Sequence, residues 1–353
     1  MITTVPDYFD EFHCLAGSCP DTCCGQWEIV VDEAAEARYR SVSGDLGQRI
    51  RAALVTMDGE TCMALEHSRC PLLTAEGLCP IVTALGEDFL SETCHTHPRF
   101  TEVYGGLRET MLSISCPEAA RLLLTRTEPL TFVTTRDDAP PEPNDLDGDL
   151  YHLVDRSRAA ALSLLQDRTR PLSDRLALVL ELGWRLEPLI DAARWDAGHR
   201  LLDRYGLRAY RDKRLTYLRR KRRGGDLAPV RDLLRSLEPL SPTVPDSYAA
   251  LAKPDLAAAE IPLEQLAVYF LFRWWRKASC NGYLYRQAGA LVTAVLATAG
   301  LTEVCGSLLE AARLFSKEVE HSEENRAAFR RAMDGPDFSL PAILSRLEVP
   351  HAI

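Results

Sequence analysis

Apolar residues recur at helical spacing through most of the second half of the chain. The clearest stretches are 176–205, 263–297 with a break near Asn281-Gly282, 303–320 and 325–333. Strand-like alternation is scarce and is confined mainly to 29–31 and 130–134. The pattern predicts a mainly α fold.

The same pattern divides the chain into three segments. Residues 1–126 hold short amphipathic stretches between glycines, including a helix expected over 32–40 with Asp32 as its N-cap. Residues 127–149 are rich in Pro and Asp and lack a sustained apolar period, so we expect a linker there. Residues 150–353 are expected to form a helical domain. No Gly-rich turn joins a convincing strand to a helix, so a Rossmann-type domain is not expected.

Charge and hydropathy narrow the class of protein. The formal net charge is −10, which argues against a general nucleic-acid binder. Residues 208–223 depart from this with nine Lys or Arg and one Asp, either as a solvated face or as a docking surface for an acidic partner or nucleic acid. The start of the chain lacks a secretory pattern, and the longest weakly polar run, 288–301, falls short of the ~20 residues of a membrane span. We expect a soluble, cytoplasmic protein with neither a nucleic acid nor a membrane as partner.

Cysteine is concentrated at the front of the chain, where nine of the 11 cysteines lie within the first 116 residues. In a reducing compartment this density favours metal or iron–sulfur ligation over disulfides. Adjacent Cys23 and Cys24 point in different directions, so we do not expect both to bind one iron. Zinc uses the same residue types, so composition leaves zinc and iron–sulfur open. The expected metal-binding cysteines are Cys14, Cys19, Cys23, Cys24, Cys70, Cys79, Cys94 and Cys116, and the expected packing cysteines are Cys62, Cys280 and Cys305.

The residues around these cysteines form a specific order of blocks. The first block reads Tyr8…Phe12-x-Cys14…Cys19-Pro-Asp-Thr-Cys23-Cys24-x-x-Trp27…Asp32. The later blocks read Cys70-Pro-Leu-Leu…Gly77-Leu-Cys79, Leu90-Ser-Glu-Thr-Cys94-x-x-x-Pro98-Arg99 and Ser115-Cys116-Pro-Glu-Ala-Ala-Arg-Leu. This order resembles the flagellin lysine-N-methylase (FliB-like) family, within a wider group of zinc- or iron-chelating cysteine-cluster proteins. The resemblance is dense from 5 to 124, and the chain departs from the family at His97, where a Tyr usually precedes Pro-Arg.

The resemblance implies an enzyme that transfers methyl groups from S-adenosylmethionine (SAM) to lysine ε-amines of flagellin and requires a [4Fe-4S] cluster. Membership does not fix the substrate, since a relative could methylate another lysine-bearing protein. Two alternatives remain open: a zinc- or iron-chelating cysteine-cluster protein without catalysis, and a redox protein.

Lysine methylation sets requirements that some residues of the chain could meet. The amine must lose its proton, and an oxygen base or an aromatic face beside the sulfonium would help. In the absence of a recognisable nucleotide fold, we expect one cluster iron to lack a Cys ligand and to chelate the amino and carboxylate groups of SAM. The expected catalytic residues are Tyr104, Tyr269 and Asp32, and the expected SAM-binding residues are Arg99, Arg121 and Arg273, although salt bridges and core packing are the ordinary roles of such residues.

Overall fold

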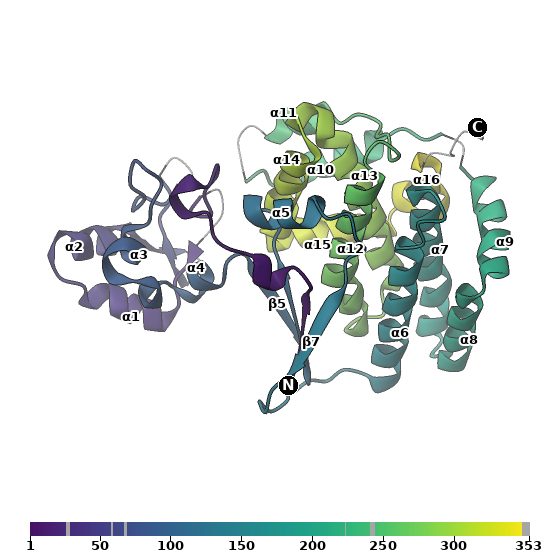
Figure 1. Cartoon of the computed structure of the whole chain (residues 1–353), viewed down its shortest axis with the longest axis horizontal. Helices are drawn as coiled ribbons and strands as arrows, with labels where there is room; N and C mark the ends of the chain where they lie inside the picture. Colours follow the sequence, from purple (N-terminus) through teal and green to yellow (C-terminus); the bar gives the residue numbers. More distant parts are fainter. Residues whose placement is uncertain (26–28, 58, 67–68, 223, 241–243, 348–353) are drawn as a thin grey trace.

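The structure, a computed structural model, describes residues 1–353 except 26–28, 58, 67–68, 223, 241–243 and 348–353. Helices dominate it, which confirms the mainly α prediction. Two separate hydrophobic cores are present: a small one drawn from residues between Ile29 and Cys94, and a large one drawn from Tyr8, Phe12 and residues between Met111 and Leu347. We call residues 13–97 the lobe and the rest of the described chain the body; Figure 1 shows the two side by side, joined beside a small sheet.

The body contains a sheet whose strands come from both ends of the lobe. Its order is β5 (Arg99–Tyr104), β6 (Leu107–Leu112), β1 (Ile2–Pro6) and β7 (Phe132–Arg136). Strand β1 pairs in parallel with β6 and antiparallel with β7, which is not the doubly wound sheet of a nucleotide-binding domain.

This sheet divides the chain differently from the three segments expected from sequence. Residues before and after the lobe belong to one sheet, so the lobe is an insertion into the body. Strand β7 lies inside the expected linker 127–149 and pairs along its whole length with β1. Strands about 130 residues apart in the chain can pair without any sign of it in the local composition. The Pro- and Asp-rich composition of this stretch therefore predicted a linker.

The lobe is built from short elements. Asp32 caps its first helix as predicted, because its carboxylate accepts a hydrogen bond from the Ala35 N–H at 2.8 Å. The lobe elements are η2 (Ala16–Ser18), β2 (Ile29–Val30), α1 (Glu33–Ser41), α2 (Gly44–Ala53), β3 (Leu54–Met57), β4 (Glu60–Met63), α3 (Pro80–Leu85), η3 (Glu87–Phe89) and α4 (Glu92–Thr96). The three strands pair in the order β2-β4-β3.

The body is helical wherever the apolar period predicted helices. The stretch 176–205 is two helices separated by a turn, and the break near Asn281-Gly282 lies between the helices Glu260–Trp274 and Leu284–Cys305. Outside the sheet, the body elements are η1 (Phe9–Glu11), α5 (Pro117–Leu124), α6 (Gly148–Leu165), α7 (Leu172–Asp191), α8 (Trp195–Gly206), α9 (Arg208–Arg219), α10 (Ala228–Ser236), α11 (Val244–Ala249), α12 (Glu260–Trp274), η4 (Trp275–Ser279), α13 (Leu284–Cys305), α14 (Leu308–Phe315), the π-helical turn η5 (Ser316–Glu320), α15 (Glu323–Arg331), η6 (Ala332–Asp334), η7 (Pro336–Phe338) and α16 (Leu340–Arg346).

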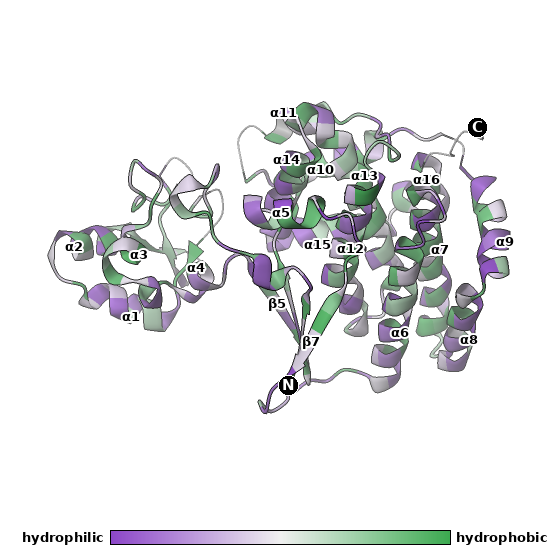
Figure 2. Cartoon of the chain, in the orientation of Figure 1, coloured by the Kyte–Doolittle hydropathy of each residue, from purple (hydrophilic) through white to green (hydrophobic). Residues whose placement is uncertain are grey.

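Helix α13 is the central helix of the body. By length and composition alone it could cross a membrane, but 72% of its most apolar window is buried. It packs against α7, α12 and α14, and Figure 2 shows its apolar residues surrounded by other helices. Its hydropathy is therefore accounted for by its place in the core of a helical domain.

The closest approach of α7 to α13 depends on Gly183. A Cβ at this position would lie 2.7 Å from the Ala288 Cβ and 3.2 Å from the Leu284 carbonyl oxygen. We therefore expect Gly183→Ala to lower the free energy of unfolding by about 1–3 kcal/mol in urea denaturation, because neither helix can move without repacking the core. Gly206→Ala, at the end of α8 with open space around it, should change stability by less than about 1 kcal/mol. Equal effects at the two positions would contradict this account of the packing.

The basic segment 208–223 is in part a structural feature. Arg219 and Arg222 both pair with Asp174 of α7, and Arg214 pairs with Glu181 of the same helix. Both carboxylates are fully buried. Several of the positive charges that mark this segment in the sequence therefore neutralise buried acids of α7, while the hydrophilic outer face of α9 meets solvent at the edge of the body (Figure 2).

Candidate functional site

Five cysteines come together inside the lobe, and we call them the five-thiol group. They are Cys23 and Cys24 of the first block, Cys70, Cys79 at the start of α3 and Cys94 on α4. Cys24 interacts electrostatically with Cys23, Cys79 and Cys94, and Cys94 interacts with Cys23, Cys70 and Cys79. A hydrogen bond from the Cys70 N–H to the Cys24 carbonyl, 2.7 Å long, ties two of the cysteine segments together.

The lobe sets the protonation of these thiols. Burial raises the pKa of Cys94 to about 11, and burial also raises the pKa of Cys70. The hydrogen bond between Cys23 and Cys24 lowers the pKa of Cys23 and raises that of Cys24. Because a cation stabilises thiolates, a bound metal would reverse the preference of Cys24, Cys70 and Cys94 for the neutral form.

Three further cysteines form a separate set where the lobe joins the body, and we call them the three-thiol group. Cys116 interacts electrostatically with Cys14 and Cys19, and Cys19 also interacts with Cys14. Cys116 precedes α5 of the body, whereas the other two belong to the first cysteine block. The eight candidate ligands are thus divided into five and three, a division that their spacing did not indicate.

The side chains of the five-thiol group are of the chemical type that binds thiophilic metals and iron–sulfur clusters. Soft thiolates from four separate segments are the ligands that such centres use. Within the described part of the chain, no three His, Cys, Asp or Glu side chains stand close enough to hold a metal ion in this arrangement. Trp27, part of the family-like block beside Cys24, lies outside the described residues. Metal ligation by these cysteines therefore stays a prediction.

Next to the lobe, the body buries a carboxylate with three polar partners. Glu320 accepts hydrogen bonds from the Tyr269 hydroxyl at 2.8 Å, from Ser316 at 2.8 Å and from Arg273 Nε at 3.3 Å. All four side chains are buried, and Tyr269 and Ser316 are fully so. Tyr269 and Arg273 were predicted site residues, and the structure brings them together on one carboxylate.

A histidine lies beside this carboxylate at the boundary with the lobe. His321 Nε2 lies 2.8 Å from Ser115 Oγ and 3.4 Å from Ser113 Oγ, and the ring of His97 is 6.0 Å away. Ser113 is in turn 3.5 Å from Ser316, so polar contacts run from the lobe boundary to the buried carboxylate. We call this set the junction network: Ser113, Ser115, Tyr269, Arg273, Ser316, Glu320 and His321.

Sequence reasoning missed Glu320, His321 and the two serines that follow β6, Ser113 and Ser115. A local signal was present for Glu320, because Phe315, Ser316, Val319 and Glu320 are all buried in one turn, and a carboxylate in an apolar stripe needs buried partners. The turn is a π-helix, a local irregularity that is frequent at functional sites. No sequence pattern marks the two serines as site residues. They lie beside this turn only because strand β6, which precedes them in the chain, ends there.

Two predicted catalytic residues lie elsewhere. Both carboxylate oxygens of Asp32 accept hydrogen bonds from backbone N–H groups, those of Ala35 and of Glu92, each at 2.8 Å. These hydrogen bonds lower the pKa of Asp32. Tyr104 is nearly buried beside Arg276, next to a cavity of about 10 Å³ between the sheet and α12, and burial raises its pKa. The structure brings neither residue to the junction network.

Two of the three predicted SAM-binding arginines also lie outside the junction network. Arg99 lies over the rings of Phe9 and Phe12 at 5.7 and 5.4 Å. Arg121 forms a salt bridge of 2.7 Å with Glu118, one helical turn away, and its side chain is 52% exposed. Of the three predicted SAM-binding arginines, only Arg273 belongs to the junction network.

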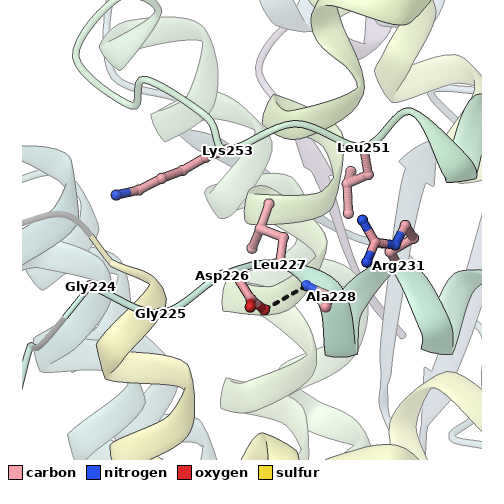
Figure 3. A pocket seen from close by; sticks show the side chains of 8 residues that line it. All are labelled: Gly224, Gly225, Asp226, Leu227, Ala228, Arg231, Leu251 and Lys253. Carbon is pink, nitrogen blue, oxygen red and sulfur yellow. Dashed lines mark hydrogen bonds between the residues drawn. The ribbon is translucent and has the colours of Figure 1, made fainter.

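A cavity in the body lies away from both thiol groups. It measures about 440 Å³ and is lined by residues 224–228, Arg231, Leu251 and Lys253. Figure 3 shows the side chains of Arg231 and Lys253 pointing to different sides, and the Asp226 carboxylate accepts a hydrogen bond from the Ala228 N–H at 2.9 Å. The cavity therefore lacks the convergent polar groups of a ligand site.

The two histidines at the boundary make a prediction for stability. Burial lowers the pKa of His97 to about 4 and that of His321 to about 3, with nearby cations adding to both shifts. Between about pH 6.5 and these values the unfolded chain binds more protons, so the protein loses stability as the pH falls through this window. In the wild type, each such histidine lowers the free energy of unfolding by up to about 1.4 kcal/mol per pH unit in this window. We expect His321→Gln to abolish the share due to His321, measured by urea denaturation at several pH values. Parallel wild-type and variant curves between pH 4 and 7 would contradict the assignment.

Comparison with known proteins identifies the relatives of the chain. No protein-family model and no solved structure matches it. It is 30% identical over 132 residues to "Lysine-N-methylase" of Salmonella choleraesuis (strain SC-B67), covering 35% of this chain and 33% of that protein. It is 30% identical over 132 residues to "Flagellar biosynthetic protein FliU" of Salmonella muenchen, covering 35% of this chain and 78% of that protein. The match thus spans about a third of the lysine-N-methylase and most of FliU, and the chain belongs to the flagellin lysine-N-methylase (FliB-like) family.

Proposed function

We propose that this protein is a cytoplasmic, SAM-dependent lysine N-methyltransferase that acts on flagellin or another lysine-bearing protein and requires an iron–sulfur cluster. The observation that carries the proposal is the grouping of five thiols in a lobe that abuts a buried tyrosine–carboxylate pair. Relatives named lysine-N-methylase support the reaction class. The relative named as a flagellar protein supports the choice of flagellin.

The five-thiol group would hold the cluster. Three thiolates would each bind one iron, drawn from Cys70, Cys79, Cys94 and one of Cys23 or Cys24, and the loops would have to close further for ligation. When bound, a cluster with one iron free of cysteine would supply a site for the amino and carboxylate groups of SAM. The three-thiol group lies apart from this set, so we assign it no ligand role here.

The junction network would receive the substrate lysine. Methyl transfer needs the uncharged amine, whose lone pair attacks the methyl carbon while the carbon–sulfur bond breaks. His97 and His321 are neutral at pH 7, and Arg273 and Lys317 face them with positive charge. A lysine entering beside them would lose water and meet these cations, and both effects favour the neutral amine.

Metal analysis and a methylation assay test this function together. The full-length protein is purified without oxygen, and iron, acid-labile sulfide and zinc are measured per chain. It is then incubated with SAM and unmethylated flagellin, whose lysines are examined by mass spectrometry. We expect a brown iron–sulfur protein and SAM-dependent methyl-lysine. A colourless protein with stoichiometric zinc would favour the chelating alternative, and an iron–sulfur protein that methylates nothing would favour the redox alternative.

A further inference from the structure

We propose that Asp21, held by Arg313 and Lys317 of the body, is a positioning residue that fixes the cysteine-bearing loop 13–24 for metal binding. The inference rests on the proposed function in taking the five-thiol group as the metal centre. It goes beyond the proposed function because it assigns part of the metal affinity of that centre to a contact between Asp21 and the helical body.

The loop has little else to hold it. It carries Cys14, Cys19, Cys23 and Cys24, half of the candidate ligands, and none of its residues is fully buried. Most of its hydrogen bonds are local, such as that from Ser18 Oγ to the Leu15 carbonyl at 2.7 Å. Cys24 packs against the small core and its carbonyl accepts the Cys70 N–H, so the end of the loop is held, and polar contacts must position the part before it.

Asp21 provides a long-range contact. One carboxylate oxygen pairs with both the Arg313 guanidinium and the Lys317 ammonium, and the other accepts a hydrogen bond from the Thr22 N–H at 2.7 Å. Among the residues that the structure describes, Asp21 is the one lobe residue that forms an ion pair with the body. It lies two residues from Cys19 and two from Cys23, so fixing Asp21 limits the positions of both thiols.

The two cations are themselves held in place. The Arg313 side chain is 7% exposed and also contacts Glu310 at 2.6 Å and the Ser115 carbonyl at 3.3 Å. Lys317 belongs to the π-helical turn that carries Glu320. The same turn therefore contacts the cysteine loop on one side and supplies the junction network on the other, which relates the position of the thiols to that of the buried carboxylate.

Charge gives the contact a second effect. Thiolates bound to iron or zinc place net negative charge at the centre, and the ion pair keeps two cations of the body beside the loop. Outer residues that orient metal ligands typically contribute 10–100-fold to metal affinity. Asp21 is placed to contribute in this way, because its loss would release the loop from both cations.

Metal retention in the full-length protein tests the inference without reference to activity. We compare Asp21→Asn, which keeps the shape and removes the charge, with Asp21→Glu, which keeps the charge. Asp45→Asn, an exposed aspartate on α2 of the same lobe, is the matched control. Iron and sulfide per chain and the loss of iron to a competing chelator are measured, and circular dichroism checks the fold.

We expect Asp21→Asn to lower the apparent metal affinity about 10-fold or more, and Asp21→Glu and Asp45→Asn to stay close to wild type. Wild-type retention in Asp21→Asn, or an equal loss in Asp45→Asn, would overturn the inference. A wild-type protein that holds zinc in place of iron would overturn the proposed cofactor alone, and the same comparison made with zinc must then still show the loss in Asp21→Asn. A wild-type protein that holds no metal would overturn both.

Discussion

Replacing Cys94 with serine is expected to lower the iron content of the anaerobically purified protein at least about 10-fold and to abolish lysine methylation with it. Cys94 interacts with the four other members of the five-thiol group and lies on α4, whose N-cap Ser91 accepts a hydrogen bond from the Cys94 N–H. A serine oxygen is a harder and more weakly acidic donor than a thiol, so it replaces the thiolate poorly at iron. The measurement is iron and sulfide per chain, with methyl-lysine as the second readout.

Matched serine substitutions elsewhere separate ligation from a general effect of losing a thiol. Cys305→Ser, at the end of α13 in the body, should leave iron and methylation unchanged. Cys116→Ser should keep most of the iron, because Cys116 belongs to the three-thiol group. If Cys116→Ser lost as much iron as Cys94→Ser, the division into five and three would be wrong. If Cys94→Ser kept its iron, the metal centre would not be the five-thiol group.

The helices of this protein could be predicted from its sequence, but the sheet and the lobe boundaries could not. Helix α12 and helix α13 follow from apolar spacing within about 40 residues, and Gly282 marks the break between them. Strand β1 has no such signal, because its five residues are defined by pairing with β6 and β7, more than 100 residues away. Local periodicity therefore predicted the helices, whose backbone hydrogen bonds are local, and not the strands, whose hydrogen-bond partners are distant in the chain.

The candidate site shows the same limit. Tyr269 and Arg273 are one helical turn apart on α12, so they could be predicted as a pair that shares a partner. That partner, Glu320, comes from a π-helical turn nearly 50 residues later, and nothing in the spacing relates the two. The cysteines were predicted by type and neighbours, whereas their division into two groups depends on how the lobe folds back on the body.

Replacing Glu320 with glutamine should lower the free energy of unfolding by about 3–5 kcal/mol, because it leaves the buried Arg273 without its charged partner. Arg273 is 5% exposed, and its guanidinium lies over the Phe100 ring at 4.1 Å, so it cannot reach water without leaving the core. Urea denaturation at neutral pH measures the loss. Tyr269→Phe removes one hydrogen bond to the carboxylate and should cost less, about 1.5–3 kcal/mol.

A double variant distinguishes a lost charge pair from a merely disturbed core. Glu320→Gln combined with Arg273→Met removes both charges while keeping most of the side-chain volume, so it should be more stable than Glu320→Gln alone. The comparison forms a double-mutant cycle with Arg273→Met, in which the coupling energy isolates the pair. If the double variant were as unstable as the sum of the two single ones, Glu320 and Arg273 would act independently, and the junction network would not be a connected unit.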